Sequence, residues 1–174
     1  GQVLREHQHG RANLRSRGGH VVDIVAPEVR SRMMASIKAR DTKPEMLVRR
    51  HLHRQGFRYR LSPKGITGRP DLVLRRHGAV VLVHGCYWHG HAECRYATVP
   101  SSNVERWQAK LAGNRLRDAR VVSDLLSQGW RVAVIWECAL KKRPEIALEG
   151  LERFIVSDRR SVEIPASPQF RRKE

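Results

Sequence analysis

The chain has 174 residues, which is enough for one compact domain with its own hydrophobic core and too few for two full domains. Its 34 Lys and Arg outnumber its 17 Asp and Glu, and the formal net charge of +17 favours a polyanionic partner, nucleic acid first and an anionic membrane surface second. No apolar run approaches the roughly 20 residues of a membrane-spanning helix, and no hydrophobic segment follows the basic N-terminus as in a signal peptide. We therefore expect a soluble, cytoplasmic protein that does not associate with membranes.

The first part of the chain predicts a basic arm followed by two helices. Residues 1–22 are rich in Arg, Gly and His without periodicity, which is typical of a disordered arm; a cloning remnant with a solvated tail explains them equally well. A proline can begin a helix over 28–40. Residues 42–45 form a capping-box pattern for a second helix that ends at Gly56. The residues of this helix expected to face the core are Leu47, Leu52 and either Met46 or Val48.

Short β-rich runs follow the second helix. Residues 57–61 alternate apolar with basic side chains, as in a half-buried strand. After a loop rich in Pro and Gly, the runs 71–74 and 79–83 are joined by a turn and predict a hairpin. Its two strands would bring Asp71 close to the residues around Val83.

The second half of the chain predicts a long helix between two strands. Asn103 can cap this helix, and Gly129 ends it before the apolar strand 130–136. Strand, helix and strand then form a right-handed βαβ crossover. The apolar positions of the helix include Trp107, Leu111, Val121 and Leu125. Trp130 and Trp136 of the strand are expected in the core.

A final helix and a tail complete the predicted organisation. The helix is expected over 144–155, and a segment rich in Pro and Arg follows it. We expect the ordered domain to span residues 23–157 and the C-terminal tail to span 158–174. The mixture of strands and helices predicts an α/β fold.

The cysteines indicate a metal site. Three cysteines cannot form a closed disulfide set, and in a reducing compartment cysteines flanked by histidines more often hold a metal. Four Cys/His ligands are the usual complement of a closed tetrahedral zinc site. His84 and His89 compete with His91, which we favour because short spacings let one loop surround the ion; three unrelated buried thiols are the alternative to any site. The predicted ligands are Cys86, His91, Cys94 and Cys138.

A second motif predicts catalysis with magnesium. Gly68-Arg69-Pro70-Asp71, followed by two hydrophobic strands, has the skeleton of the PD-(D/E)xK nucleases. The carboxylate of Asp71 is a hard oxygen ligand of the kind that magnesium prefers. The second strand ends in Val83 and His84, where that motif would have an acid, a spacer and a lysine. The general motif is therefore incomplete.

The departure from the motif points to one branch of these nucleases. The strings GRPDLVL, VVLVHGCYWHGH, RWQAKLAGNRLRD and GWRVAVIWECAL resemble the very-short-patch (Vsr) mismatch repair endonucleases, in the same order and with nearly the same spacing. The resemblance covers residues 28 to 155, most of the chain. It implies a restriction-endonuclease-like core, in which a mixed central sheet is flanked by helices and a zinc ion is structural.

The resemblance also implies roles for the candidate active-site residues. Asp71 would bind magnesium, and the main-chain carbonyl of Val83 would supply another ligand. His84 and His89 match the catalytic histidines of the family, which act on the attacking water and near the scissile phosphate. Asp118 matches an acid that orients a histidine and raises its basicity.

Two assignments from the resemblance have alternatives. Glu45 matches a helix-borne acid near the metal site, although a role in the capping box explains it equally well. The zinc ligands of the family carry over to the four Cys/His residues named above. One residue is inserted between His91 and Cys94, so His89 remains an alternative zinc ligand.

Aromatic residues near the motif suggest how a mismatch would be recognised. Side chains pushed between base pairs pay a stacking penalty that is smaller where a mismatch has already weakened the duplex. The resemblance implies that Tyr87, Trp88 and Trp107 act as such wedges, with Met34 and Ile37 pressing from the other groove. Core packing is the alternative for Trp107, Met34 and Ile37. The full set expected to contact DNA is Met34, Ile37, Arg69, Tyr87, Trp88, Trp107 and Asn114.

These observations predict a DNA endonuclease with catalytic Mg²⁺ and structural Zn²⁺. The first hypothesis is an enzyme of the bacterial cytoplasm that acts as a monomer on mismatched double-stranded DNA near the nucleoid. It would nick one strand at a T:G mismatch, starting repair of deaminated 5-methylcytosine with mismatch-repair proteins as partners. A restriction or defence nuclease that cuts paired duplex is the second hypothesis. A zinc-stabilised DNA-binding module without catalysis is the third, and the acid and imidazole residues argue against it.

Overall fold

A computed structural model describes residues 29, 32, 40–99 and 103–165. The predicted arm over 1–22, most of the predicted helix over 28–40 and the end of the chain from residue 166 lie outside these described residues. Met34 and Ile37 lie outside them as well. Within the described part, no helix is both long and apolar enough to cross a membrane.

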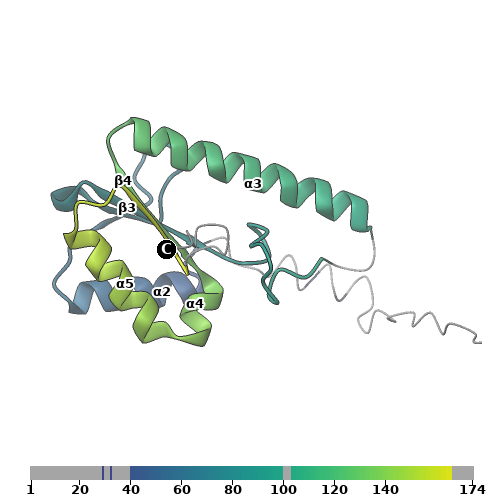
Figure 1. The fold of residues 1–174 in the computed structure, drawn as a ribbon, viewed down its shortest axis with the longest axis horizontal. Coiled ribbons are helices and arrows are strands. Elements are labelled where there is room, and N and C mark those ends of the chain that lie inside the picture. Colours follow the sequence, from purple (N-terminus) through teal and green to yellow (C-terminus); the bar gives the residue numbers. More distant parts are fainter. Residues whose placement is uncertain (1–28, 30–31, 33–39, 100–102, 166–174) are drawn as a thin grey trace, which may run out of the picture.

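A five-stranded mixed sheet forms the centre of the protein (Figure 1). Its strands lie in sequence order, with antiparallel pairing between the first three strands and parallel pairing from the third to the fifth. The predicted α/β fold with a mixed central sheet is confirmed, and β3 and β4 are parallel as a crossover requires. The strands are β1 (Arg60–Leu61), β2 (Leu72–Leu74), β3 (Ala79–His84), β4 (Arg131–Trp136) and β5 (Ser161–Ile164).

Helices cover both faces of the sheet and produce three layers. Figure 1 shows α3 along one face, with α2, α4 and α5 gathered on the other. The helices are α2 (Lys43–Arg54), α3 (Val104–Ser127), α4 (Glu137–Lys142) and α5 (Pro144–Val156).

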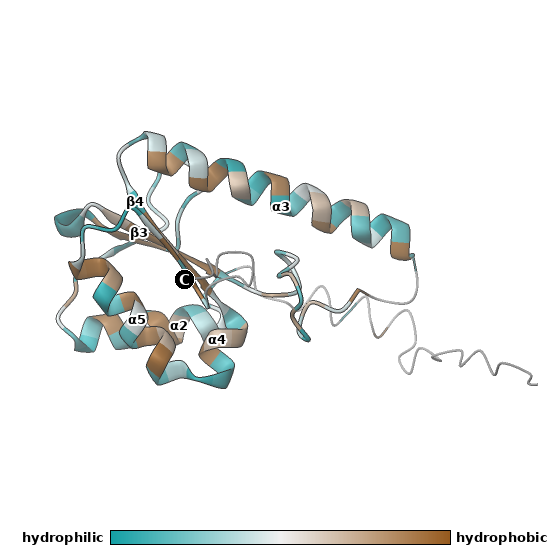
Figure 2. Ribbon diagram, in the orientation of Figure 1, coloured by the Kyte–Doolittle hydropathy of each residue, from teal (hydrophilic) through white to brown (hydrophobic). Residues whose placement is uncertain are grey.

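The core follows from the alternation of side chains along the strands. Leu72, Val81 and Ile135 face the cluster that contains residues of α2 and α5. Val73 and Val80 belong to the cluster on the opposite face, where Leu125 of α3 is buried. Figure 2 shows that β3 and β4 are hydrophobic, whereas α3 carries both hydrophobic and hydrophilic residues. A sheet buried on both faces requires strands that are apolar on both faces.

The second predicted helix is confirmed as α2. Thr42 is its N-cap and accepts a hydrogen bond from the main-chain N–H of Glu45 at 3.4 Å. The helix ends before Gly56, whose φ of +83° suits glycine. Val48 rather than Met46 is fully buried with Leu52, and Leu47 packs beside them.

Two local predictions were partly wrong. A strand was predicted over 57–61, but β1 contains only Arg60–Leu61. Its partner β2 ends at Leu74, where the chain enters a 3-10 turn. Residues 57–58 therefore have no strand to pair with. Asn103 precedes α3 as predicted, but its side chain makes no capping hydrogen bond, since its main chain is left-handed with φ +54°.

The C-terminal region contributes more structure than predicted. Residues 161–164 were assigned to a tail, yet they form β5 and pair with β4, Ala133 lying opposite Val162. A fifth strand covers what would otherwise be the exposed edge of β4. The short helix α4 was also missed. It follows β4 directly and carries Cys138.

Candidate active site and metal centre

Asp71 lies at the start of β2 and is fixed by its neighbours. The preceding loop packs against α3 so closely that a Cβ atom on Gly68 would lie 2.2 Å from Cγ1 of Val121. The main-chain N–H of Val83 donates to Oδ2 of Asp71 at 2.7 Å, which confirms that the hairpin brings the two residues together. Burial raises the pKa of Asp71 to about 6; the Val83 hydrogen bond opposes this rise, and Glu45 adds to it.

A cleft of about 700 Å³ opens beside Asp71. It lies between the loop before β2, the end of β3, the start of α2 and the middle of α3. The predicted catalytic and magnesium-binding residues all line it, together with two of the predicted DNA contacts. The predicted residues in the cleft are Glu45, Arg69, Asp71, Val83, His84, Trp88, His89 and Asp118.

The two predicted catalytic histidines lie face to face. Their ring centroids are 3.9 Å apart with an interplanar angle of 5°. Nδ1 of His89, in the loop after β3, is 2.6 Å from Oδ2 of Asp118 on α3. Burial lowers the pKa of His84 to about 3, and the neighbouring His89 adds to this effect. Burial alone would raise the pKa of Asp118, but its hydrogen bond with His89 brings that pKa below its usual value. At neutral pH the site therefore holds a neutral His84 and an ionised Asp118.

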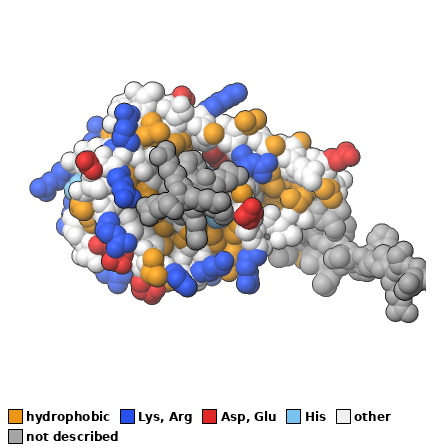
Figure 3. Space-filling model, viewed as in Figure 1, with side chains coloured by type: hydrophobic (Ala, Val, Ile, Leu, Met, Phe, Trp, Pro, Cys, Tyr) orange, Lys and Arg blue, Asp and Glu red, His pale blue; other side chains and the backbone are white. Residues whose placement is uncertain are grey.

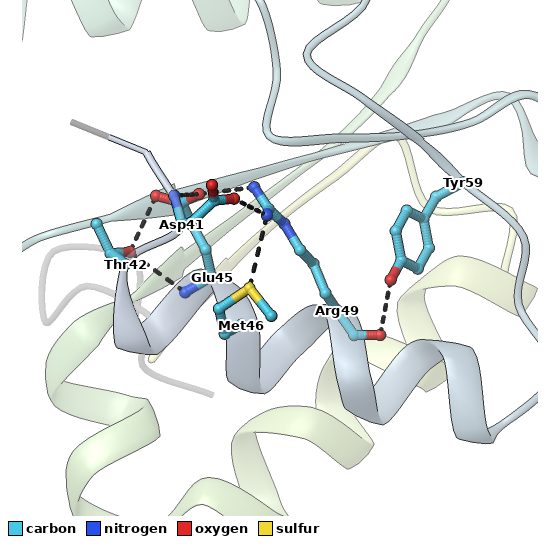
Figure 4. Close-up of polar contacts among 6 residues, drawn as sticks. All are labelled: Asp41, Thr42, Glu45, Met46, Arg49 and Tyr59. Carbon is cyan, nitrogen blue, oxygen red and sulfur yellow. Dashed lines mark hydrogen bonds and ion pairs between the residues drawn. The ribbon is translucent and has the colours of Figure 1, made fainter. Parts of the chain in front are cut away.

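Glu45 both caps α2 and lines the cleft. Its Oε1 accepts a hydrogen bond from the hydroxyl of Thr42 at 2.9 Å. Its Oε2 accepts from the guanidinium of Arg49 at 2.8 Å and from the main-chain N–H of Asp41 at 3.1 Å. Figure 4 shows these contacts around the first turns of α2. The two predicted roles of Glu45 are thus compatible.

The predicted zinc ligands converge on one point. Their ligand atoms all lie within 4.8 Å of one another, and the cluster contains His91 rather than His89, which pairs with Asp118. Nδ1 of His91 is 3.6 Å from Sγ of Cys86 and 3.4 Å from Sγ of Cys138. Zinc bond lengths give a tetrahedron with edges of about 3.5–3.8 Å, so these separations fit such an ion.

Burial shapes the chemistry of this Cys/His cluster. It raises the pKa of the Cys86 and Cys138 thiols and lowers that of His91. The ring of His91 also stacks on Trp136, with centroids 4.0 Å apart and an interplanar angle of 8°. Neutral imidazole suits a metal directly, whereas buried thiols need a cation to become thiolates.

The three described aromatic residues predicted as wedges form one group. Tyr87 and Trp88 come from the loop after β3, and Trp107 comes from the first turn of α3. Ring centroids are 5.0 Å apart for Tyr87 and Trp88, and 5.7 Å apart for Tyr87 and Trp107. Nζ of Lys110 lies 5.6 Å from the Trp88 ring and 5.3 Å from the Trp107 ring. Each of the three rings is half-buried, so part of its surface remains accessible.

The other two predicted DNA contacts differ in their surroundings. Nδ2 of Asn114 donates to the carbonyl of Trp88 at 2.8 Å, and its Oδ1 accepts from Arg117 at 2.9 Å. Asn114 thus ties the aromatic loop to α3. Arg69 is exposed at the cleft. Lys and Arg side chains are spread over the face of the molecule seen in Figure 3.

Sequence reasoning missed several residues of this region. Arg49 stands four residues after Glu45, a spacing that could have identified it as an ion-pair partner. Arg117 lines the cleft next to Asp118. Glu137 also lines it, and its Oε2 accepts from the main-chain N–H of Cys86 at 3.3 Å. No local sequence pattern predicts this contact, because it joins residues 51 positions apart.

Comparison with known proteins shows several relatives. A family model described as "DNA mismatch endonuclease Vsr" matches residues 22–95. The chain is 42% identical over 120 residues to the type II nicking enzyme V.XorIIP of Xanthomonas oryzae pv. oryzae, covering 69% of this chain and 88% of the relative. It is 42% identical over 135 residues to the type II nicking enzyme V.NmeAIP of Neisseria meningitidis, covering 78% and 95%. It is 36% identical over 148 residues to the DNA mismatch endonuclease Vsr of Escherichia coli, covering 83% and 94%.

Proposed function

The chain belongs to the Vsr family of DNA endonucleases, and from this premise we propose that it is a magnesium-dependent enzyme that nicks one strand beside a T:G mismatch. Such a nick would start very-short-patch repair of deaminated 5-methylcytosine. Relatives named as nicking enzymes support the single-strand nick, and a relative named as a mismatch endonuclease supports action at a mismatch. We further propose that the enzyme acts as a monomer on double-stranded DNA and passes the nicked product to mismatch-repair proteins.

The observation that carries the proposal is the convergence of acids and imidazoles in one cleft. The carboxylates of Asp71 and Glu45 are oxygen donors of the kind that bind Mg²⁺. Continuing the register of Leu72 with Val81 puts Pro70 opposite Val83, and proline has no N–H to offer the Val83 carbonyl. That carbonyl is a third suitable oxygen. When bound there, magnesium would activate water and neutralise charge on the phosphate.

The protein's own residues would supply the proton transfer. Asp118 holds Nδ1 of His89, so Nε2 is the nitrogen left to accept a proton from the attacking water. His84 is neutral at physiological pH and stacks on His89. We propose that it limits the movement of the His89 ring and contacts the scissile phosphate through a hydrogen bond rather than through charge.

The Cys/His cluster would hold a structural zinc ion. Four protein ligands leave no open position for a substrate, which is the pattern of structural rather than catalytic zinc sites. The proposed ligands are Cys86, His91, Cys94 and Cys138. Zinc would join the loop after β3 to the start of α4. Because that loop also carries His89 and Trp88, the ion would fix the position of catalytic and DNA-contacting residues.

Mismatch selectivity would come from the aromatic group of Tyr87, Trp88 and Trp107. Inserting rings between bases costs a few kcal/mol of stacking, and this cost is smaller at a mispair. Lys110 lies over two of the rings and could neutralise a nearby phosphate. Insertion of these rings would therefore favour nicking of T:G duplexes over T:A duplexes.

The test is single-turnover nicking of each strand in matched T:G and T:A duplexes. We expect one strand to be nicked, and the T:G duplex to react much faster. Trp88→Ala should reduce that preference mostly through the mismatched substrate, while Trp88→Phe should retain most of it because an aromatic face remains. Equal rates on the two duplexes, or cutting of both strands of the paired one, would overturn the mismatch proposal and favour a restriction nuclease.

A second test concerns the metal. Asp71→Ala should abolish cleavage and largely spare DNA binding, because it removes one metal ligand from a basic surface. His84→Ala and His89→Ala belong in the same series. Magnesium-dependent cleavage by Asp71→Ala would refute the proposed site.

A further inference from the structure

Arg49 is a buried charged residue at the back of the candidate metal site. Its side chain is 8% exposed and forms an i,i+4 ion pair with Glu45, whose side chain is 7% exposed. A second terminal nitrogen of the guanidinium bonds Oδ1 of Asp41. Figure 4 shows the guanidinium facing these two carboxylates, with one terminal nitrogen directed to each, above the first turns of α2. Arg49 does not line the catalytic cleft, so it can act there through the Glu45 carboxylate it holds or through its charge, which opposes the rise that burial causes in the pKa of Asp71.

Helix stability does not require this arrangement. On α5, Glu149 and Arg153 form an ion pair with the same N–O separation of 2.8 Å, but their side chains are 64% and 66% exposed. Burying such a pair removes two charges from water, and the attraction between them often does no more than repay that cost. The Nε atom of Arg49 is also buried, without a hydrogen-bond partner among the described residues. The buried pair is therefore better explained by what it does to Glu45.

The hydrogen bonds of Glu45 define which of its oxygens remains available. A carboxylate offers about four lone-pair positions, two on each oxygen. Oε2 accepts from Arg49 and from the main-chain N–H of Asp41, which fills both of its positions. Oε1 accepts only from the Thr42 hydroxyl in the described structure. One position thus remains, on Oε1, for a ligand in the cleft.

Asp41 strengthens this arrangement from outside the helix. Its main chain is left-handed, with φ +57°, a conformation that Asp tolerates better than most residues. That conformation accompanies two contacts, the N–H bond to Glu45 and the carboxylate bond to Arg49. Arg49 and Asp41 therefore hold each other as well as Glu45.

We propose that Arg49 is a positioning residue that fixes the Glu45 carboxylate with Oε1 directed to the metal ion. The inference rests on the proposed magnesium-dependent function. Arg49 occupies the opposite oxygen, so the Glu45 side chain cannot turn without breaking a buried charge pair. Residues that orient metal ligands in this way usually change metal affinity or activity by about 10- to 100-fold when they are replaced.

The experiment compares Arg49→Met with Arg153→Met, which breaks the exposed pair of the same spacing. Binding of Mn²⁺ to the free protein is followed by loss of its EPR signal, and nicking rates are measured across a Mg²⁺ titration. For Arg49→Met we expect about 10- to 100-fold weaker Mn²⁺ binding and a matching rise in the Mg²⁺ concentration for half-maximal rate. Arg153→Met should leave both quantities unchanged.

The outcomes separate the inference from the proposed function. If Arg49→Met binds Mn²⁺ as tightly as Arg153→Met does, the positioning role is refuted, even if its nicking rate falls. Should Arg49→Met fail to fold, Arg49→Lys takes its place: it keeps the charge but lacks the planar fork that reaches two carboxylates, so weaker binding is again expected and unchanged binding refutes the role. Asp71→Ala serves as the reference, because Mg²⁺-dependent nicking by that variant would defeat the proposed site itself.

Discussion

Replacement of Gly68 by alanine tests whether the loop before β2 sets the position of Asp71. Gly68 has φ +70°, and its missing side chain leaves room for Val121 of α3. An added Cβ would lie 2.2 Å from Cγ1 of Val121 and 3.0 Å from Cγ2. Cβ atoms in folded proteins essentially never lie under 3 Å from a non-bonded heavy atom, so the loop or the helix must move.

The expected cost has two parts that a control can separate. An alanine in the left-handed region costs about 1–2 kcal/mol, wherever it stands. Forcing an extra carbon into a packed contact costs about 1–3 kcal/mol more. Gly65 has φ +83° with no atom within 4 Å of the added Cβ, so Gly65→Ala should show the first cost alone. Gly68→Ala should therefore lower the free energy of unfolding by about 2–5 kcal/mol, against about 1–2 kcal/mol for Gly65→Ala.

Activity should respond more strongly than stability. Only Arg69 and Pro70 separate Gly68 from Asp71, so a displaced loop moves the carboxylate directly. A misplacement of about 1 Å in a catalytic group can reduce the rate about 100-fold. Urea unfolding measures the first effect, and single-turnover nicking at saturating Mg²⁺ measures the second. Gly65→Ala should nick DNA at nearly the parental rate.

A rescue by Val121→Ala makes the reasoning refutable. This change removes both methyl groups and leaves the Val121 Cβ 3.2 Å from the added carbon, a tight but tolerable contact. The double variant should be more stable than the sum of the two single effects predicts. If Gly68→Ala is no less stable than Gly65→Ala, or if Val121→Ala gives no rescue, the contact does not position the loop.

Three further predictions concern the acids and the cluster. Asp118→Asn should lower the single-turnover rate about 10²- to 10⁴-fold with little change in the Kd for DNA, because it removes the partner that orients His89; an equal loss of binding would contradict this role. In metal-free protein the pKa of Asp71 is about 6 in the folded state and 3.8 in the unfolded state. Between these two pH values the folded state binds more protons, so the free energy of unfolding falls as pH rises. Asp71→Asn should abolish that part of the pH dependence in urea titrations. One zinc ion per chain should co-purify by elemental analysis, and Cys138→Ser should lower the melting temperature; a well-folded, metal-free protein would contradict the zinc assignment.

The hairpin and its consequence were predictable because the signals are local. Two short, continuous apolar runs and a turn at Gly78 define β2 and β3, and Asp71 must then face the end of β3. Cys138 lies 52 residues from Cys86, yet its place also follows from simple geometry. β3 and β4 are parallel with His84 opposite Trp136, so the residues two positions beyond each strand emerge side by side.

Other features depend on contacts that no local pattern encodes. β5 alternates polar and apolar residues over only four positions, which is too short a pattern to identify a strand, and it forms because β4 offers an edge. The i,i+4 spacing of Glu45 and Arg49 is common on exposed helices. Sequence alone could not indicate that this pair is buried behind the proposed metal site. The position of Glu137 beside Cys86 likewise requires the completed sheet.

The topology of the sheet explains why the two candidate metal sites are neighbours. The parallel strands β3 and β4 end at the same edge, where the antiparallel strand β2 begins, so Asp71, His84 and Trp136 all lie there. Trp136 contacts both sites, since His91 stacks on its face and His84 packs against it with ring centroids 5.1 Å apart. Its indole Nε1 donates to Glu163 of β5 at 2.6 Å, which fixes the ring from the strand next to β4. An ion bound to the Cys/His cluster would therefore hold the proposed catalytic histidines through a rigid tryptophan as well as through the loop that carries His89.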